Sequence, residues 1–423
     1  MVALDLLARL ARDYPFKLSC LHVNHRISPN AAAWARFVRA AARERGIACS
    51  VRVVNLAPYR HLGLEGAARA ARYAVLARAS ADFVVLAHHQ DDQAETVLLQ
   101  LVRGAGLPGL AAMPGARQPA SRRTPTLLRP LLGVSRAQIR AYARRRGLEW
   151  IEDETNADER RARNWVRRRV IPLLRELNPE AAANLARSAA HLAEASTLVQ
   201  ELAASDARRA TRDGRLRVTG LARLSTARAR NVLRWVFASH GLRAPETARL
   251  EELLHQLLTA RADATVLVSL NGIEVRRYRD SVWLVPQRPV PPRAFRAVWD
   301  GRRTWPLPQL GGTLRFKTAR GKGIAAAALE TERLEVRARN GGERFQPGAN
   351  RPRRALKGLL QEAGIPPWER ERLPLLYQGE KLVFVPGVGV AAGAEPRPRE
   401  RGLVVSWEPR AAKSMTARKA VIK

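Results

Sequence analysis

Cysteines, lysines and long apolar runs are scarce in this chain of 423 residues. Its two cysteines, Cys20 and Cys49, exclude a disulfide framework and a zinc site built from four cysteines. No stretch approaches the roughly 18 uninterrupted apolar residues of a membrane span. Charged residues also interrupt the first twelve positions, where a signal peptide needs an apolar run. We therefore expect a protein of the reducing cytoplasm that has no membrane partner.

Acidic residues are few as well, with 38 Asp and Glu against 74 Lys and Arg, which gives a formal net charge of +36. Solubility alone requires a much smaller surplus, so we expect a polyanionic partner. Only eight of the basic residues are Lys. A GC-rich genome and a demand for planar phosphate-binding groups would both produce that bias. Apolar residues make up 46% of the chain, which is enough for folded cores.

The first 175 residues predict an α/β domain, because short β-rich runs alternate with longer helical patterns. The expected strands are Lys17–Asn24, Ser50–Leu56 and Asp82–His88, and they would form an open parallel sheet. Ligands bind such sheets at the carboxyl ends of the strands. A helical pattern begins at Met1 with no strand before it, so the domain starts in the middle of a βα unit.

The remaining residues predict two further domains and a tail. Residues 176–285 are mainly helical, and a proline-rich linker, Pro286–Arg293, follows them. Residues 294–408 mix strands with one basic helix, Arg353–Ala363, which indicates a small α+β domain. Residues 409–423 are basic and lack apolar periodicity, so we expect a disordered tail.

A polar motif, His88–Thr96, closes the third predicted strand and opens a helix. Asp92, Glu95 and Thr96 are spaced i, i+3 and i+4, so they share one helix face. Two carboxylates in an oxygen-rich crevice suit Mg²⁺ accompanied by phosphate. The alternative is an acidic first turn that only caps the helix.

Half of the eight histidines, His22, His25, His88 and His89, lie at the ends of predicted strands. A zinc site is one interpretation, but no cysteine and no helical pair at i, i+4 accompanies them. Contacts to a nucleotide or a base explain the clustering equally well.

Two charged helices complete the set of motifs. In the first, Glu65, Arg69, Arg72 and Tyr73 form one stripe, which is either a solvated, ion-paired face or an arginine clamp near a phosphate. In the second, residues 151–169 place an acidic turn before an arginine-dense helix. That helix either follows a nucleic-acid backbone or is an ordinary basic surface helix.

Taken together, six segments resemble the tRNA(Ile)-lysidine synthetase family in order and spacing: LHVNHRIS, GLEGAARAARY, AHHQDDQAETVLLQLVRGAG, LLRPLL, WIEDETN and RARNWVRRRVIPLL. Three C-terminal segments resemble the last domain of the same family: RNGGERFQPG, ALKGLLQEAGIPPWERERLPLL and VPGVGVA. The likeness covers nearly the whole chain.

The resemblance implies a PP-loop ATP pyrophosphatase domain of the adenine nucleotide alpha hydrolase-like fold, then a helical substrate-binding domain and an α+β tRNA-binding domain. It implies a ligase that uses ATP and Mg²⁺ on the minor isoleucine tRNA with a CAU anticodon. ATP would adenylate the wobble cytidine at C2 and release pyrophosphate. The amine of free L-lysine would then displace AMP, forming lysidine. Relatives commonly form homodimers.

The resemblance also assigns residues. It implies chemistry at His88, Asp92, Glu95, Arg69 and Arg72, with Asp92 and Glu95 as the Mg²⁺ ligands. It implies nucleotide contacts from His22, Asn24, His25, Glu65, Tyr73 and His89. Contacts to tRNA are expected from Asp153, Asn156, Arg163, Asn164, Arg168, Arg344, Arg353, Arg354 and Lys357, with Trp368 on the same surface.

One element of the family's pattern has no counterpart in the sequence. The family opens with a strand and an SGGxDS phosphate loop, and relatives continue after that loop much as Met1–Leu7 does. Either the start codon was assigned too late or the chain is truncated. Without the loop's amides the pyrophosphate loses its cradle, so we expect little or no ligase activity from this chain. A non-catalytic tRNA-binding protein and another PP-loop tRNA-modifying enzyme are the alternatives.

Overall fold

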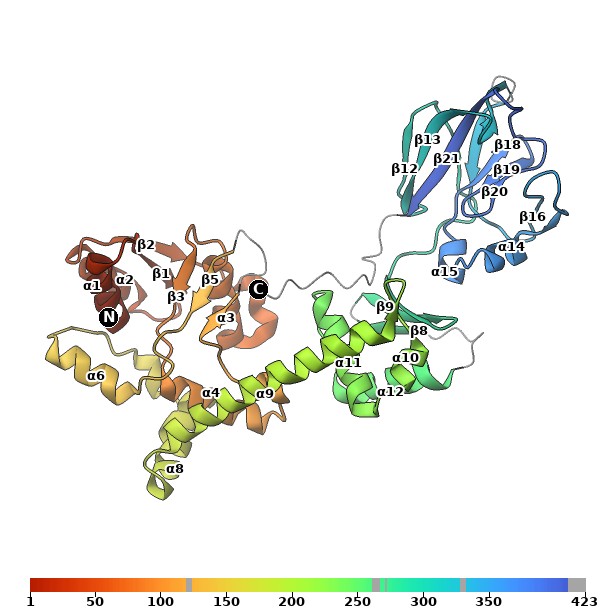
Figure 1. Cartoon of the computed structure of the whole chain (residues 1–423). Helices are drawn as coiled ribbons and strands as arrows, with labels where there is room; N and C mark the ends of the chain where they lie inside the picture. Colours follow the sequence, from red (N-terminus) through yellow and green to blue (C-terminus); the bar gives the residue numbers. More distant parts are fainter. Residues whose placement is uncertain (119–123, 261–266, 271, 328–331, 410–423) are drawn as a thin grey trace. The chain divides into compact units, whose positions relative to one another are not determined.

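The computed structural model describes residues 1–118, 124–260, 267–270, 272–327 and 332–409 (Figure 1). The chain divides into two compact units, Met1–Val199 and Gln200–Lys423. No helix in the described part of the chain is long and apolar enough to cross a membrane.

Parallel strand pairs form the centre of the first unit. β1 (Ser19–Asn24) pairs with β2 (Ala48–Val53), and β3 (Phe83–Val85) pairs with β5 (Thr126–Leu128), both in parallel. β4 (Ala116–Arg117) adds an antiparallel edge to β5. The three predicted strands are therefore present. They do not form one continuous sheet, because no described strand joins the β1 edge to the β3 edge. The strands form two separate sheets instead.

Helices surround these strands and close two small cores. Ala94 of the helix that follows β3 is fully buried against Val166, Ile171 and Ala182, and Val2 packs against the helix that ends near Arg145. The helices of this part are α1 (Val2–Asp13), α2 (Ala31–Arg43), a 3-10 turn η1 (Ala57–Leu62), α3 (Gly63–Leu76), α4 (Gln90–Val102), α5 (Leu107–Leu110) and α6 (Arg136–Arg145).

The arginine-dense segment changes helix type along its length, although the sequence predicted one helix. A 3-10 turn, η2 (Glu154–Ala157), precedes α7 (Ala162–Trp165), which continues as a π-helix, η3 (Val166–Val170), and then as α8 (Ile171–Leu177). Pro172 explains the wider turn, since proline has no N–H for the carbonyl of Arg168. Single π turns of this kind are rare and recur at functional sites.

A helical domain opens the second unit. Leu233, Leu250, Leu253 and Val275 are buried in its core, which joins the helices to a three-stranded antiparallel sheet of order β10-β9-β8. Its elements are α9 (Ala181–Ala210, which contains the boundary between the units), β6 (Thr211–Arg212), β7 (Arg215–Leu216), α10 (Val218–Ala222), α11 (Thr226–Ser239), α12 (Thr247–Thr259), β8 (Leu267–Leu270), β9 (Ile273–Tyr278) and β10 (Ser281–Pro286).

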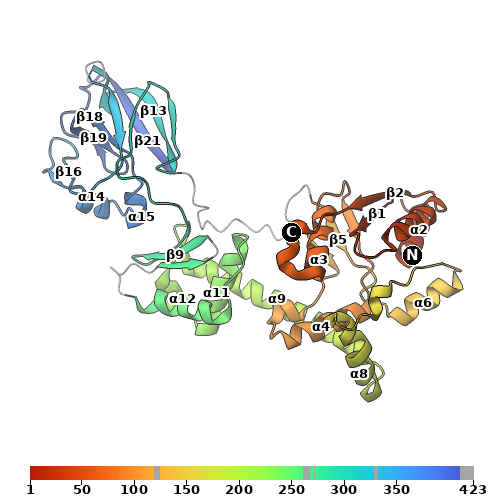
Figure 2. The ribbon, with the colours of Figure 1, turned by 180° about the vertical axis from the view of Figure 1, so that it is seen from behind.

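The last domain packs two antiparallel sheets over one core, as predicted for an α+β module (Figure 2). One sheet has the order β11-β15-β18-β19-β20 and the other β12-β13-β21-β14, with a separate β16-β17 pair. The strands are β11 (Arg296–Val298), β12 (Thr304–Leu307), β13 (Gly312–Arg320), β14 (Ile324–Ala325), β15 (Leu334–Arg337), β16 (Arg344–Phe345), β17 (Arg354–Ala355), β18 (Leu375–Gln378), β19 (Lys381–Val385), β20 (Gly389–Val390) and β21 (Arg401–Pro409).

Two helices and one strand end in this domain differ from the expected limits. α14 (Leu356–Glu362) is shorter than the predicted basic helix because Arg354 and Ala355 pair in β17. α15 (Pro367–Arg370) starts on a proline. The predicted tail is wrong at Pro409, which pairs with Gly312 in β21, and the rest of it, 410–423, lies outside the described residues.

Candidate active site

The first turn of α4 is fixed by its two aspartates. Asp92 Oδ2 accepts the backbone N–H of His89, the residue before the helix, at 3.0 Å. Asp91 accepts the backbone N–H of Arg136 and the guanidinium of Arg175, both at 2.8 Å. The capping alternative therefore holds for Asp92, whose carboxylate closes the start of the helix.

Glu95 is fully buried and is held by two arginines. Arg163 Nε donates to its Oε2 at 2.9 Å, and Arg167 donates through Nε to Oε1 at 2.6 Å and through Nη2 to Oε2 at 3.0 Å. Arg163 also donates to Thr96 Oγ1 at 2.9 Å. A buried carboxylate is stable when cations and hydrogen bonds satisfy both oxygens, as they do here.

This arrangement does not fit the predicted Mg²⁺ ligand pair. Both oxygens of Glu95 face guanidinium groups, and Asp92 Oδ1 lies 3.5 Å from Arg167 Nη2 while its Oδ2 caps α4. In the described part of the chain no three His, Cys, Asp or Glu side chains gather in a way that could hold a metal ion. The assignment of Glu95 as a metal ligand is therefore corrected, because its charge is already balanced by arginine.

The stripe on α3 lies beside the ends of β1 and β5. Arg72 Nε is 3.4 Å from His25 Nε2, just after β1. Tyr73 Oη accepts from Arg69 at 3.4 Å and from Arg129 at 3.3 Å. The helix thus carries an arginine cluster toward the strand ends, as the clamp interpretation requires. Glu65 is exposed, and none of the hydrogen bonds or ion pairs between described residues joins its side chain to this cluster.

Arg129 was not among the predicted site residues. It is only 4% exposed, follows β5, and donates through Nη1 to the carbonyl of Pro114 at 2.8 Å, while its buried Nε has no partner. The signal was present in the segment LLRPLL, where a lone arginine stands among apolar residues. An arginine buried without a carboxylate indicates a place prepared for an anion.

His88 lies among these cations and is neutral at pH 7. Burial lowers its pKa to about 4; Asp92 acts against this shift, whereas Arg129, Arg163 and Arg69 add to it. Burial and neighbouring arginines also lower the pKa of His22 and of His25. The buried Nδ1 atoms of His25 and His88 have no hydrogen-bond partner among the described residues. This cluster therefore offers arginine charge and unsatisfied neutral imidazoles to a ligand.

Asn24 and His89 have local structural contacts. Asn24 Oδ1 accepts the N–H of Arg26 at 2.8 Å, and its Nδ2 donates to the carbonyl of Ala31 at 3.3 Å, so it shapes the turn after β1. His89 Nδ1 is 3.7 Å from Asp91 Oδ2. These two residues border the cluster and organise its backbone.

Lowering the pH from 6.5 toward 4 is expected to destabilise the first unit through His88. Because the pKa of His88 is lowered in the folded state, the unfolded chain takes up this proton first, and stability present above pH 6.5 is lost as the pH falls toward about 4. Urea midpoints measured across this range should depend less on pH in His88→Gln. The matched variant at an exposed histidine, His61→Gln, should keep the original slope. Identical slopes for the parent chain and His88→Gln would contradict the assignment.

The second predicted cluster is mainly a scaffold. Asn164 is 7% exposed and donates to the carbonyls of Thr155 at 2.8 Å and Asp158 at 3.0 Å. Its side chain is therefore engaged inside the protein, contrary to the expectation that it contacts tRNA. Asp153 accepts the N–H of Thr155 at 2.8 Å. Arg163 is turned inward to Glu95. Two residues keep polar surface, namely Asn156 and Arg168, and the latter also pairs with Glu159 at 3.3 Å.

The basic residues predicted in the last domain are mostly exposed. Arg353 and Lys357 have no carboxylate partner among the described residues, whereas Arg354 pairs with Glu362 and Arg344 donates to the carbonyl of Arg353 at 3.3 Å. Trp368 is 7% exposed, which corrects the expectation that it lies on an open RNA-facing surface.

Three family models match this chain. A PP-loop domain model covers residues 1–174, a TilS substrate binding domain covers 216–283, and a TilS substrate C-terminal domain covers 334–407. These ranges follow the order of the first unit, the helical domain and the two-sheet domain.

Curated relatives match almost end to end. The tRNA(Ile)-lysidine synthase of Nitrosomonas europaea is 39% identical over 97% of this chain and 89% of the relative. That of Ralstonia nicotianae is 44% identical over 95% of this chain and 88% of the relative. That of an Azoarcus species is 42% identical over 97% of this chain and 90% of the relative. At this identity and coverage, the chain belongs to the tRNA(Ile)-lysidine synthase family.

Proposed function

We propose that this chain's reaction is the joining of L-lysine to C2 of the wobble cytidine in the CAU anticodon of the minor isoleucine tRNA. Family membership makes it a ligase-type, ATP-using, tRNA-modifying enzyme. In the first step the O2 oxygen of cytidine bonds to the α-phosphate of ATP, and pyrophosphate leaves. In the second step the lysine amine bonds to C2, AMP leaves with the oxygen, and the amine loses a proton.

The arginine cluster around His88 is the observation that carries this proposal. Arg69 of α3, Arg129 just after β5 and Arg163 of α7 act electrostatically on His88, and Arg72 reaches the end of β1. Attack on the α-phosphate builds negative charge on phosphate oxygens, and fixed cations aimed at that charge lower the barrier. The neutral imidazoles of His22, His25 and His88 add no charge of their own and are free to hydrogen-bond the nucleotide.

Glu95 acts in this proposal as a positioning residue. Its carboxylate fixes the guanidinium groups of Arg163 and Arg167 against α4, close to Asp92. Mg²⁺ would arrive with the phosphates of ATP as part of the substrate, and no step is assigned to a metal held by Glu95. Asp92 is the carboxylate that acts against the lowered pKa of His88.

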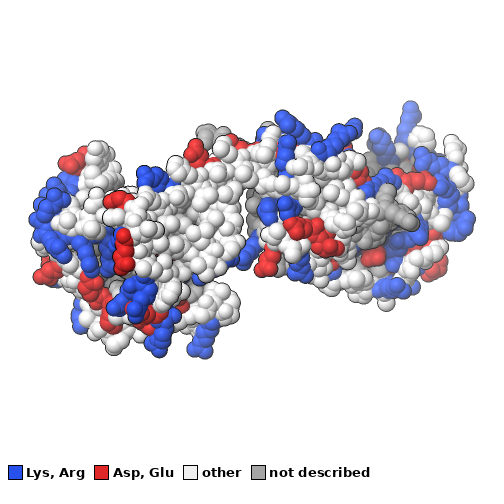
Figure 3. Space-filling model, turned by 90° about the horizontal axis from the view of Figure 1, so that it is seen from below, with Lys and Arg blue, Asp and Glu red and all other residues white. Residues whose placement is uncertain are grey.

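Surface charge supports tRNA as the partner of this basic chain. In the view of Figure 3, Lys and Arg side chains gather in several groups separated by uncharged surface. Arg353 and Lys357 are exposed and pair with no carboxylate in the part of the chain that the structure describes, so they suit phosphate contacts, which do not depend on base sequence. A homodimer and a cytoplasmic location are further parts of the proposal.

Ligase activity is expected to depend on a phosphate loop that this sequence does not contain. Given ATP labelled at the α-phosphate and tRNA without lysine, the 423-residue chain should label tRNA at least about 100-fold more slowly than the same chain preceded by a strand and an SGGxDS segment, because single anion-binding donors already contribute that much. Added lysine should release the label as AMP.

Two outcomes would contradict the proposal separately. Equal labelling by both chains would refute the need for the loop. If the extended chain never labelled tRNA, the ligase assignment itself would fail. An extension with the same strand but alanines in place of SGGxDS is the control, since it restores strand pairing without the amide cradle.

A further inference from the structure

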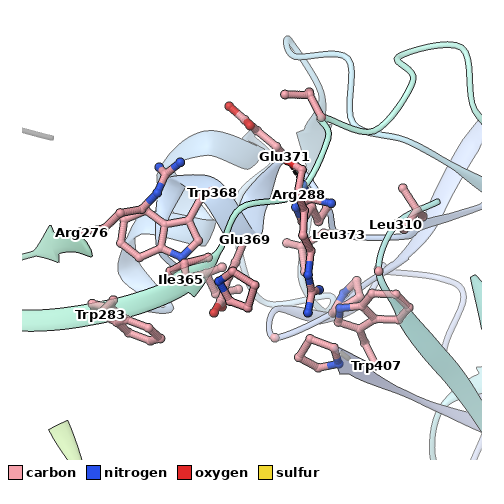
Figure 4. A pocket seen from close by; sticks show the side chains of 18 of the residues that line it. Arg276, Trp283, Arg288, Leu310, Ile365, Trp368, Glu369, Glu371, Leu373 and Trp407 are labelled. Atoms are coloured by element: carbon pink, nitrogen blue, oxygen red, sulfur yellow. Dashed lines mark hydrogen bonds between the residues drawn. The ribbon is translucent and has the colours of Figure 1, made fainter. Parts of the chain in front are cut away.

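A cavity of about 980 Å³ lies in the second unit, where β9 and β10 of the helical domain face α15 and β21 of the last domain. Ligand sites of small molecules have this size and combine apolar walls with a few polar groups. None of the residues assigned above to chemistry lines it. Figure 4 shows Glu369 and Arg288 between Trp283 on one side and Trp407 on the other.

Tryptophan rings form the walls of this cavity. Trp283 is paired across the hairpin with Arg276, and its ring meets Trp368 edge-on with centroids 5.8 Å apart. The guanidinium of Arg276 lies 5.0 Å from the centre of the Trp368 ring, and that of Arg215 lies 4.1 Å from the centre of the Trp283 ring. These contacts hold Trp283 and Trp368 in place, and half-buried Trp407 lines the opposite wall. Unpaired bases stack on such rings regardless of sequence.

Two polar groups in the cavity have no partner of their own. The half-buried carboxylate of Glu369 makes no ion pair or hydrogen bond with any described residue, and burial raises its pKa, which nearby Arg215 partly offsets. The buried Trp283 Nε1 likewise has no acceptor among the described residues. Both residues line the same space. The unpartnered indole N–H of Trp283 is costly to bury unless a ligand satisfies it, and the carboxylate of Glu369 offers an acceptor to a ligand in the cavity.

The other charges of the cavity are largely engaged. Glu274 pairs with Arg276 at 2.7 Å, and Arg372 Nη2 donates to the carbonyls of Arg288 and Pro289 at 3.1 and 2.7 Å. Four arginines and three glutamates line the space, so the wall is cationic by one charge: Arg215, Arg276, Arg288, Arg372, Glu274, Glu369 and Glu371. Such a wall suits a phosphate next to a base that meets Glu369.

We propose that this cavity binds one unpaired nucleotide of the substrate tRNA whose base carries an exocyclic amino group, with Glu369 accepting from that amino group and Trp283 Nε1 donating to a ring acceptor. The inference rests on tRNA as the proposed substrate. A carboxylate accepts from the amino group of cytosine in known base contacts. Adenine and guanine also have amino groups, whereas uracil offers none. The cavity therefore selects cytosine, adenine or guanine over uracil.

Mononucleotide binding to the full 423-residue chain tests the base preference. We expect CMP to bind about 10-fold more tightly than UMP in calorimetric titrations, since uracil presents its O4 acceptor to Glu369 where cytosine presents its amino donor. CMP and UMP are compared because adenine nucleotides would also occupy the arginine cluster of the first unit. Glu369→Gln should erase the difference. Trp283→Phe keeps a ring for Arg215 and Trp368 but removes the donor, so it should weaken CMP binding and retain part of the preference.

Glu371→Gln is the matched control, because it removes the same charge from an exposed glutamate of the same cavity. Binding of intact tRNA should weaken about 10-fold in Glu369→Gln and remain unchanged in Glu371→Gln. Equal tRNA affinities of the two variants, or equal affinities of the parent chain for CMP and UMP, would overturn the proposal. Unchanged thermal unfolding of Glu369→Gln would show that the loss is not a folding defect.

Comparing the binding of intact tRNA with that of a tRNA that lacks its three unpaired 3′ nucleotides shows which part of the tRNA supplies the base in the cavity. If the base comes from that end, shortening weakens binding to the parent chain and leaves Glu369→Gln unaffected. If it comes from a loop, Glu369→Gln weakens binding of both tRNAs equally. Either result supports the cavity as a base site. Failure of the parent chain to bind tRNA at all would instead refute the proposed function, and tRNA binding without any effect of Glu369→Gln refutes only the cavity.

Discussion

Replacing Glu95 by alanine is expected to lower the free energy of unfolding of the first unit by about 3–5 kcal/mol. The substitution leaves the guanidinium groups of Arg163 and Arg167, each about one-quarter exposed or less, without their shared carboxylate. It also opens a void beside Ala94, which is fully buried. Hydrogen exchange of peptides from α4 and α7, together with urea unfolding, would measure the loss in this unit separately from the second.

Glu159→Ala is the matched control for that experiment. Glu159 also joins two arginines, Arg168 at 3.3 Å and Arg169 at 3.0 Å, but these pairs lie at the surface. Exposed ion pairs contribute about 0–1 kcal/mol, so this variant should unfold almost like the parent chain. If Glu95→Ala lost no more than Glu159→Ala, Glu95 would not be the centre of the arginine cluster.

The affinity of the chain for tRNA should fall by about 10³- to 10⁵-fold between 50 and 200 mM salt if roughly six to ten phosphates are contacted. The net charge of +36 provides the cations, and their contacts release counterions from the RNA. Filter binding at several salt concentrations gives the slope directly. A flat response would exclude phosphate contacts as the main source of affinity.

Single substitutions can locate the phosphate contacts behind that slope. Lys357→Ala and Arg353→Ala remove exposed cations that pair with no described carboxylate, and each should reduce the slope by about one. Arg302→Ala is the control, because Arg302 is already neutralised by Asp300. If all three variants reduced the slope equally, total charge rather than a defined surface would bind the RNA.

Local patterns predicted the α/β start, the helical middle and the α+β end, because periodicity and strand composition are local properties of a sequence. They also placed His25 and Arg72 near one rim, and these are in contact. The partners of Glu95 were not predictable, since Arg163 and Arg167 are 68 and 72 residues away and only the packing of α7 on α4 joins them. A carboxylate one turn after Asp92 looks the same in sequence whether it binds a metal ion or an arginine.

Spacing also could not reveal which polar residues are buried. Asn164 belongs to a motif rich in exposed arginine, yet it is enclosed by the carbonyls of Thr155 and Asp158. Glu369 and Trp283 are 86 positions apart, and their shared cavity depends on how the β9–β10 hairpin meets α15. Neither residue has a local pattern that distinguishes it from an ordinary surface glutamate or core tryptophan.

The π-helix at Val166–Val170 holds one residue more than an ordinary turn of α-helix. Each residue of an α-helix turns the chain by about 100°, so a deletion within a regular helix rotates everything beyond it by that angle. Deleting one residue from Val166–Val170 would instead remove the extra residue, and the segment would relax to an ordinary α-helix with both flanks in register. Ile171 would stay on Ala94 and Arg163 on Glu95. A deletion of one residue should therefore be tolerated in this segment and disrupt the core when it falls in α7 or α8.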